Sequence, residues 1–297
     1  MTLLSFLPAY YTAPCLPAYA GSIREPAFAG SFYPDASGQL SALIKQYVSR
    51  VKPVQFNRPP NTSLKALIIP HAGYVYSAYE AMHFFEILRA SSVRYDTFII
   101  INPNHTGYGE HVEVDSNDSW NTPLGNVRVD TEFARQLDLP RSDRAQMQEH
   151  SAEVMLPLLQ VSLPEEFRIV PISMLRQNPI TAMEVAEKIR DANKVLKRKL
   201  MIIASSDFTH FESPVDGKMK DDLVLEQIEK QDSEKLYDTV IQNRISVCGY
   251  GPIMTLIEYS KLLTYNPSSA ILARGHSGKT RPSSSVVDYI TILFYHD

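Results

Sequence analysis

Short apolar runs alternate along this chain with segments in which apolar residues recur at helical spacing. Four of the runs are rich in Ile, Leu, Val or Met and contain at most one charged residue each: Leu64–Pro70, Thr97–Asn102, Arg168–Ile172 and Leu200–Ser205. Apolar runs of this length are typical of strands that are buried on both faces of a parallel sheet. A longer run, Ser285–Tyr295, predicts a closing strand near the C-terminus.

The segments between these runs fit amphipathic helices. They span Ser77–Arg89, Thr131–Asp138, Ser151–Ser162, Pro179–Leu196, Val215–Gln231 and Pro252–Leu263. Ser77 and Glu80 have the spacing of a capping box, which predicts a helix start just after the first strand. Because strands and helices alternate, we expect an α/β fold with a central, largely parallel or mixed sheet that helices cover on both faces.

The 297 residues are expected to form one α/β domain over residues 24–297, preceded by an N-terminal extension over residues 1–23. Pro53–Pro60 has the composition of a linker, but the preceding segment, Ala27–Val51, is too short to bury a core of its own. The extension is apolar and ends near Ala-Tyr-Ala, as secretory signals do, yet no basic residue follows Met1 and prolines interrupt it. It is therefore interpreted as a loosely held extension.

The composition is that of a globular protein with a sizeable core, since 44% of the residues are apolar and 21% are charged. The net charge of −4 supplies no strong field for nucleic acid or for an anionic membrane, and no apolar run approaches the roughly 20 residues that span a bilayer. The two cysteines, Cys15 and Cys248, cannot form a disulfide scaffold, so free thiols in a reducing, cytoplasmic setting are expected. Neither nucleic acid nor membrane is therefore an expected partner, and nothing in the sequence indicates an oligomeric state.

Polar side chains of similar kind follow three of the predicted strands. His71 comes after the first, His105 after the second, and Asp207 and His210 after the fourth. Ligands of open α/β sheets bind outside the carboxyl ends of the strands, and parallel strands would bring these residues to one edge. A single His after a strand is more often an ordinary loop residue, but a fold has no structural need for imidazole at several strand ends. The three histidines therefore indicate a site.

Cys248 lies in Ser-Val-Cys-Gly-Tyr-Gly-Pro, directly before a predicted helix. Its spacing alone favours a small buried thiol beside a tight turn. The alternative is a thiolate at a helix N-terminus, where the helix dipole lowers the pKa of the thiol and makes it a nucleophile or a soft metal ligand. Two imidazoles and one thiolate would form a site that suits iron, copper or zinc, and spacing does not choose among these metals.

The segment Glu149-His-Ser-Ala-Glu153 begins another predicted helix, which would place His150 and Glu153 on one face. One interpretation is a solvated capping cluster at the start of that helix. The other is contact with a substrate or with the metal ligands. The spacing leaves both interpretations open.

Several short fragments form a specific signature when they are taken together and in order. They are Arg24-Glu-Pro-Ala-Phe-Ala-Gly-Ser-Phe-Tyr33, Pro70-His-Ala-Gly-Tyr74, Asn104-His105, Glu149-His-Ser-Ala-Glu153, Ser205-Ser-Asp-Phe-Thr-His210, Cys248-Gly249 and Ser285-Val-Val-Asp-Tyr289. On these fragments the sequence resembles the Memo family (mediator of ErbB2-driven cell motility), which is related to the LigB-type class III extradiol dioxygenases. The resemblance covers nearly all of the chain after the extension and implies the fold of that family.

The resemblance also implies a site. Related dioxygenases bind non-haem Fe(II) through two His and one Glu, and use a further His as acid and base. Carried over, His71 and His105 take the two imidazole positions, and His210 takes that of the acid/base His. Cys248 falls where the dioxygenases have their carboxylate ligand, and Asp207 would orient His210 or reach the metal. This thiolate departs from the oxygen-activating pattern of two His and a carboxylate.

Members of the Memo family are described as binding iron or copper without clear dioxygenase activity. We therefore expect a metal-binding, redox-related protein with a dioxygenase-like cleft, with iron or copper as its cofactor, zinc as an alternative metal, and no organic cofactor. One alternative is an active iron dioxygenase, or another metal-assisted enzyme, that acts on a small aromatic substrate with His210 as general base. The other is a binding module with a relic active site.

A small molecule or a peptide is the expected occupant of the cleft, and the binding module would recognise a peptide or a small anion. Its expected contacts are Phe32, Tyr74, Tyr76, His150 and Glu153, with His210 beside them. Phe32 stands where eukaryotic relatives have a Trp. This difference weakens any transfer of the phosphopeptide binding that is described for those relatives.

Overall fold

Four parallel strands form the centre of the structure, and they correspond to the four predicted apolar runs. They are β2 (Ser63–Ile69), β3 (Thr97–Pro103), β7 (Arg168–Met174) and β8 (Leu200–Ser205), in the sheet order β7-β3-β8-β2. This computed structural model describes residues 21–51, 63–90, 93–163, 165–263 and 268–296. The predicted linker, Cys15 and nearly all of the predicted extension lie outside the described residues.

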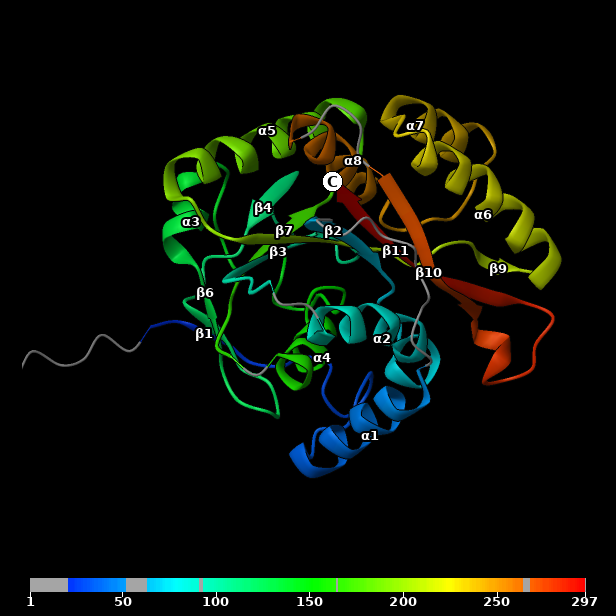
Figure 1. Ribbon diagram of the computed structural model, residues 1–297, viewed down its shortest axis with the longest axis horizontal. Coiled ribbons are helices and arrows are strands. Elements are labelled where there is room, and N and C mark those ends of the chain that lie inside the picture. The colour runs from blue at the N-terminus through cyan, green and yellow to red at the C-terminus, as the bar shows by residue number, and fades with distance from the viewer. Residues whose placement is uncertain (1–20, 52–62, 91–92, 164, 264–267, 297) are drawn as a thin grey trace, which may run out of the picture.

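Further strands of both directions extend this centre into a mixed sheet (Figure 1). On one side lie β11 (Val286–His296) and then β10 (Ser268–His276), and on the other lie β6 (Val127–Val129), β5 (Ser119–Trp120) and β1 (Ile23–Arg24). Outside this order, β4 (Val112–Val114) pairs with β7, and β9 (His210–Glu212) pairs with β11. The predicted mixed, largely parallel sheet is confirmed, although it already begins at Ile23, the last residue assigned to the extension.

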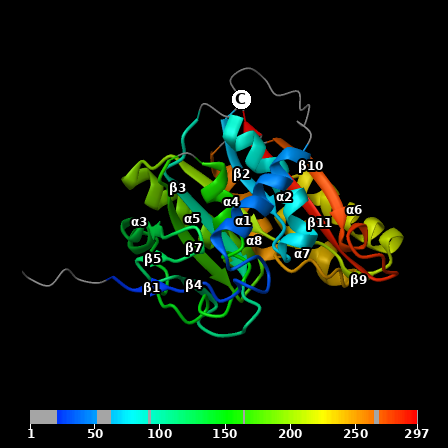
Figure 2. The same ribbon diagram turned by 90° about the horizontal axis from the view of Figure 1, so that it is seen from below.

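Helices cover both faces of this sheet, so the described chain is one α/β domain. Against one face lie α1 (Ser37–Arg50), α2 (Tyr74–Ala90) and α4 (Met155–Ser162). Against the other lie α3 (Thr131–Gln136), α5 (Pro179–Leu196), α6 (Pro214–Glu229), α7 (Ser233–Gln242) and α8 (Tyr250–Leu263). Figure 2 shows α1 and α2 crossing the near face of the sheet. In the described ranges, no helix has both the length and the apolar character that a membrane span requires.

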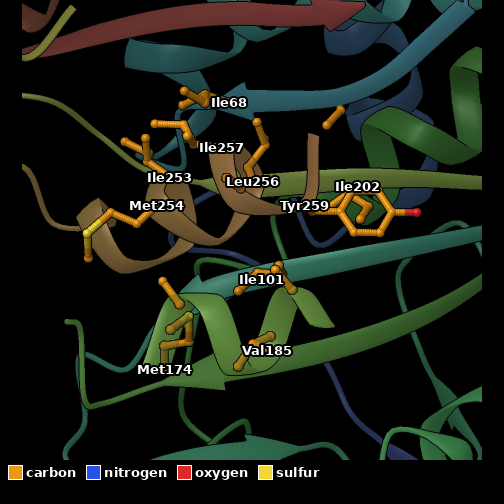
Figure 3. Close-up of a cluster of buried hydrophobic side chains, with 14 of the residues drawn as sticks. Ile68, Ile101, Met174, Val185, Ile202, Ile253, Met254, Leu256, Ile257 and Tyr259 are labelled. Carbon is orange, nitrogen blue, oxygen red and sulfur yellow. The ribbon is translucent and has the colours of Figure 1, made fainter. Parts of the chain in front are cut away.

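Alternate residues of the central strands enter two separate hydrophobic cores. Ile101 of β3 packs toward α5 and α8, whereas its neighbour Ile100 packs in the core beneath α2 and α4. Figure 3 shows Ile101 among side chains from α5 and α8, including Val185 and Ile257. Side chains of an extended strand alternate between the faces of the sheet, and both faces are covered here, which is why these strands are apolar throughout.

Two helix starts differ from the predictions. α2 begins at Tyr74, because the N–H of Ser77 already donates to the carbonyl of Gly73, and the Ser77 hydroxyl donates to the carbonyl of Ala72 at 2.8 Å. The predicted capping box is therefore wrong. α4 begins at Met155, so residues 151–154 form a turn before the helix, and Glu149 and His150 precede that turn.

Candidate metal centre

The carboxyl ends of three parallel strands bring predicted site residues to one edge of the sheet. His71, His105 and Asp207 each lie two residues beyond the end of their strand, β2, β3 and β8 respectively. β8 lies between β2 and β3, so the three loops are neighbours. Cys248 reaches the same place from the turn that precedes α8.

His71, His105 and Cys248 lie close enough together to share one cation. One ligand atom from each lies within 4.8 Å of the others. Nε2 of His71 is 3.3 Å from Sγ of Cys248, and the ring centroids of His71 and His105 are 5.2 Å apart. His71 is buried, Cys248 is partly buried and His105 is exposed. The expected convergence of two imidazoles and a sulfur is present, and their role as ligands stays a prediction.

Ser205 determines which nitrogen of His71 carries the proton. The Ser205 hydroxyl donates its hydrogen to the carbonyl of Ser151 at 2.7 Å. Nδ1 of His71 lies 2.7 Å from the same hydroxyl oxygen and must therefore donate to it. Burial, followed by the neighbouring imidazoles, lowers the pKa of His71 well below its usual value. The ring is therefore neutral, and its Nε2 directs a lone pair toward Cys248, as a metal ligand must.

Glu149 orients His105 in the same way. Its buried carboxylate accepts from Nδ1–H of His105 at 2.9 Å and from the backbone N–H of His105 at 2.7 Å. It also accepts from the backbone N–H and the hydroxyl of Ser151. Burial raises the pKa of Glu149, but the hydrogen bonds from His105, with the electrostatic interaction of the neighbouring imidazoles, outweigh burial and lower it to about 2. A carboxylate behind an imidazole is the usual partner of a metal-binding His, and it leaves Nε2 free for the metal.

The environment of Cys248 keeps its thiol protonated in the protein alone. Sγ accepts the backbone N–H of Asp207 at 3.3 Å. Burial, and then the Asp207 carboxylate, raises the pKa of Cys248. In the protein alone, these two effects favour the first interpretation of Cys248, a small protonated thiol, over a thiolate at the start of α8. A bound cation would supply the positive charge that deprotonates such a thiol.

Asp207 and His210 have separate partners. Oδ1 of Asp207 accepts the backbone N–H of His71 at 2.7 Å, and burial outweighs this bond and raises the pKa of Asp207 to about 6. Nδ1 of His210 lies 2.8 Å from the carbonyl of Ser246, which can only accept, so Nδ1 carries the hydrogen. Ser246, rather than Asp207, therefore orients His210. Nδ1 is thereby engaged, and the ring is partly exposed.

A fourth imidazole, that of His150, packs against the two predicted histidine ligands. Its ring stacks on His105 with 4.8 Å between centroids and lies 5.2 Å from His71. The ring of Phe32 lies 4.6 Å from that of His150, measured between centroids. Tyr76, another predicted ligand contact, lies on α2 and is partly buried. Burial lowers the pKa of His150 to about 4, so this ring is neutral near pH 7. His150 and Phe32 therefore form an aromatic wall beside the predicted ligands.

His105, Glu149 and His150 make up a second group whose possible ligand atoms lie within 4.8 Å of one another. Both oxygens of Glu149 already accept hydrogen bonds from protein groups. A carboxylate engaged in this way would have to release those donors before it could bind a cation. The group that contains Cys248 is therefore the better candidate.

Two predicted ligand contacts face the protein interior instead. The buried carboxylate of Glu153 accepts from Nη1 of Arg24 at 2.7 Å, from the hydroxyl of Tyr33 at 2.6 Å and from two backbone N–H groups. The hydroxyl of the buried Tyr74 donates to the carbonyl of Val154 at 2.7 Å. Both residues hold the segment around Arg24 and α2 against the turn before α4, so their polar groups are engaged within the protein.

Comparison with known proteins gives one consistent result. A family model described as Memo-like protein matches residues 24–293. A MEMO1 family protein of Archaeoglobus fulgidus is 39% identical over 267 residues, which are 89% of this chain and 96% of that protein. A MEMO1 family protein of Desulfurococcus amylolyticus is 36% identical over 275 residues, again 89% and 96% of the two chains.

One solved structure, that of an uncharacterized protein from Escherichia coli K12, has a TM-score of 0.51 and 11% sequence identity. The match covers 78% of this chain and 99% of that one. At this identity the likeness shows a shared fold and nothing of function.

Proposed function

Because the chain belongs to the Memo-like protein family, we propose that it binds a redox-active iron or copper ion through His71, His105 and Cys248. The observation that carries this proposal is the tautomer of the two imidazoles. Ser205 and Glu149 each engage Nδ1, so both rings offer Nε2 within 4.8 Å of the sulfur. Two nitrogens and a sulfur suit copper and iron, and they also suit zinc.

The chemistry of these side chains fits a cation. The imidazole of His71 is neutral, and the thiol of Cys248 would give up its proton to solvent when a positive charge binds beside it. Bound iron or copper would supply one-electron transfer to or from a small molecule in the site. The chain itself holds the ligands in place, because Glu149 and Ser205 restrain the rings from behind. No organic cofactor is part of the proposal.

A second candidate function, metal-assisted catalysis on a small aromatic molecule, is favoured by His210. Its Nδ1 is bound to the carbonyl of Ser246, so Nε2 is free to accept a proton from a substrate. The aromatic wall of His150 and Phe32 would pack against an aromatic ring. In this function His210 is the general base.

Metal analysis of protein purified without chelator tests the ligand assignment. We expect stoichiometric iron or copper in the wild type and a loss of at least about tenfold in affinity in His71→Ala and Cys248→Ser. His111→Ala is the matched control, because His111 is exposed and lies outside the cluster. If the two ligand variants bind iron and copper as tightly as the wild type does, the assignment is wrong.

Oxygen consumption with a panel of catechols, after loading with Fe(II), separates the two functions. Turnover that His210→Ala abolishes would establish the enzyme. If no turnover depends on His210, the second candidate is removed. Binding of a peptide or a small anion that survives loss of the metal ligands would instead favour a binding module.

A further inference from the structure

Two buried aspartates lie behind the loop that carries Asp207 and His210. Asp221 is on α6 and Asp288 is on β11, and their exposed fractions are 0% and 4%. Neither belongs to the predicted metal centre. Buried carboxyl groups are rare unless they are paired, so their partners need to be identified.

A glycine on α6 makes room for one of the two carboxyl groups. Gly217 and Asp221 are four residues apart on this helix and therefore share a face. A Cβ atom at position 217 would lie 2.3 Å from Oδ2 of Asp288. Glycine is unfavourable inside a helix, and here its lack of a Cβ atom allows Asp288 to reach the helix beside Asp221.

The hydrogen bonds of Asp221 are those of an ionised carboxylate. Oδ1 accepts from the backbone N–H of Thr209 at 3.0 Å and from the Thr209 hydroxyl at 2.6 Å. Oδ2 accepts from Nη2 of Arg274 at 3.3 Å. These three groups are all donors, so the Asp221 carboxylate accepts hydrogen bonds from them without carrying a proton itself.

The carboxyl group of Asp288 is in the opposite situation. Its buried Oδ2 has no donor among the residues that the structure describes. Burial, and then the negative charge of Asp221, raises the pKa of Asp288 to about 7, and a hydrogen bond between the two carboxyl groups acts in the same direction. Two ionised carboxylates in contact would repel each other strongly in a buried site, so a proton between them resolves the contact.

The other charged groups near this pair leave Asp288 without a cation of its own. Arg274 of β10 contacts Asp221 and also Asp222, the exposed neighbour of Asp221 on α6. On β9, Glu212 lies near Gly217 and is paired with Lys220. In the described part of the chain, Arg274 is thus the cation facing the pair, and it binds Asp221.

The aspartate pair is joined directly to the site loop. The N–H of Phe208 donates to the carbonyl of Asp288, and the N–H of Asp288 donates to the carbonyl of Thr209, both at 2.9 Å. Thr209 is therefore bound to Asp288 through its backbone and to Asp221 through its N–H and hydroxyl. Asp207 and His210 flank this pair of loop residues on either side.

We propose that Asp288 is a positioning residue that acts as a carboxylic acid, donating a hydrogen bond to Asp221 and thereby fixing the loop that carries Asp207 and His210. When the shared proton leaves for solvent, two anions face each other behind Phe208 and Thr209, and the loop loosens. The effect of a looser loop on His210 as a general base rests on the proposed function. The acid pair itself does not depend on a bound metal.

Hydrogen exchange of the protein as purified, read by mass spectrometry over residues 206–211, tests this proposal. After correction for intrinsic exchange, we expect protection of the loop in the wild type to fall about tenfold between pH 6 and pH 8.5. Asp288→Asn should abolish this pH dependence, because its amide still donates to Asp221 and does not titrate. Asp222→Asn, which changes the same charge on the exposed neighbour, should retain it. A wild-type loop with equal protection at both pH values, or pH dependence that persists in Asp288→Asn, would overturn the proposal.

Thermal unfolding of the same proteins provides a second measurement. The pKa of Asp288 is raised in the folded protein, so the wild type loses stability as the pH rises toward 7. The unfolding temperature of Asp288→Asn minus that of the wild type should therefore increase between pH 5 and pH 8.5. The same difference for Asp222→Asn should not increase. A relative midpoint of Asp288→Asn that falls with pH contradicts the proposal. The metal content of these preparations reports separately on the metal centre, because neither aspartate is a proposed ligand.

Discussion

Replacing Glu149 by Gln removes the negative charge that holds His105 while keeping the size of the side chain. The carboxylate accepts from two donors of His105 and from two donors of Ser151. A glutamine has one acceptor oxygen, and its NH2 group would face donors in place of the second. We therefore expect His105 to lose its fixed tautomer and a buried N–H or hydroxyl to lose its acceptor.

Glu149→Gln should change both the metal affinity and the free energy of unfolding. Loss of the group behind a metal-binding imidazole weakens metal binding by about 10- to 100-fold. The pKa of Glu149 falls from 4.5 to about 2 on folding, which corresponds to a contribution of up to about 3 kcal/mol to the free energy of unfolding at neutral pH. Because the folded pKa is the lower one, this contribution is present above pH 4.5 and is lost as the pH falls toward 2.

Competition with a chromogenic chelator measures the metal affinity, and urea unfolding at pH 7 and pH 3 measures the stability. The stability difference between the wild type and Glu149→Gln should be smaller at pH 3 than at pH 7. Glu110→Gln is the control, because Glu110 is exposed and lies five residues from His105 in the sequence. If Glu149→Gln matches Glu110→Gln in metal affinity within about twofold and in stability at pH 7, Glu149 does not hold His105 for a metal.

Three further predictions concern the surroundings of the site. The ring protons of His150, followed by NMR, should titrate with a midpoint near 4 because burial disfavours the charged ring, and a midpoint near 6.5 would show a solvated ring instead. Gly217→Ala should lower the free energy of unfolding by about 1–3 kcal/mol, because the new Cβ atom would lie 2.3 Å from Asp288. The gain in stability that is ordinary for Gly→Ala in a helix would contradict this. Arg24→Met leaves the buried carboxylate of Glu153 without its cation and should cost about 3–5 kcal/mol in urea unfolding, whereas a loss below about 1 kcal/mol would show that the ion pair is dispensable.

The central strands could be predicted because their sequence signal is local. Burial on both faces demands apolar residues throughout, and the predicted run Leu200–Ser205 coincides with β8. The start of α2 could not be predicted in the same way. Ser77 has the spacing of a cap, but its hydroxyl donates to the carbonyl of Ala72, and the helix begins one turn earlier. Local spacing does not reveal which of two backbone partners a hydroxyl chooses.

The candidate site was predictable only in part, for a related reason. His71 and His105 follow parallel strands, and topology brings such residues to one edge. The groups that orient them, Ser205 and Glu149, are 134 and 44 residues away along the chain, and no spacing rule pairs them in advance. The pKa of Cys248 shows the same limit, because burial and the Asp207 carboxylate, which raise this pKa, are tertiary contacts that the local sequence does not reveal.

Anomalous scattering from crystals of untreated protein tests the metal centre most directly. We predict a peak at the absorption edge of iron or copper that lies within coordination distance of Nε2 of His71, Nε2 of His105 and Sγ of Cys248. A stoichiometric metal peak at any other position, or crystals of untreated protein in which this position has no anomalous signal, would contradict this prediction.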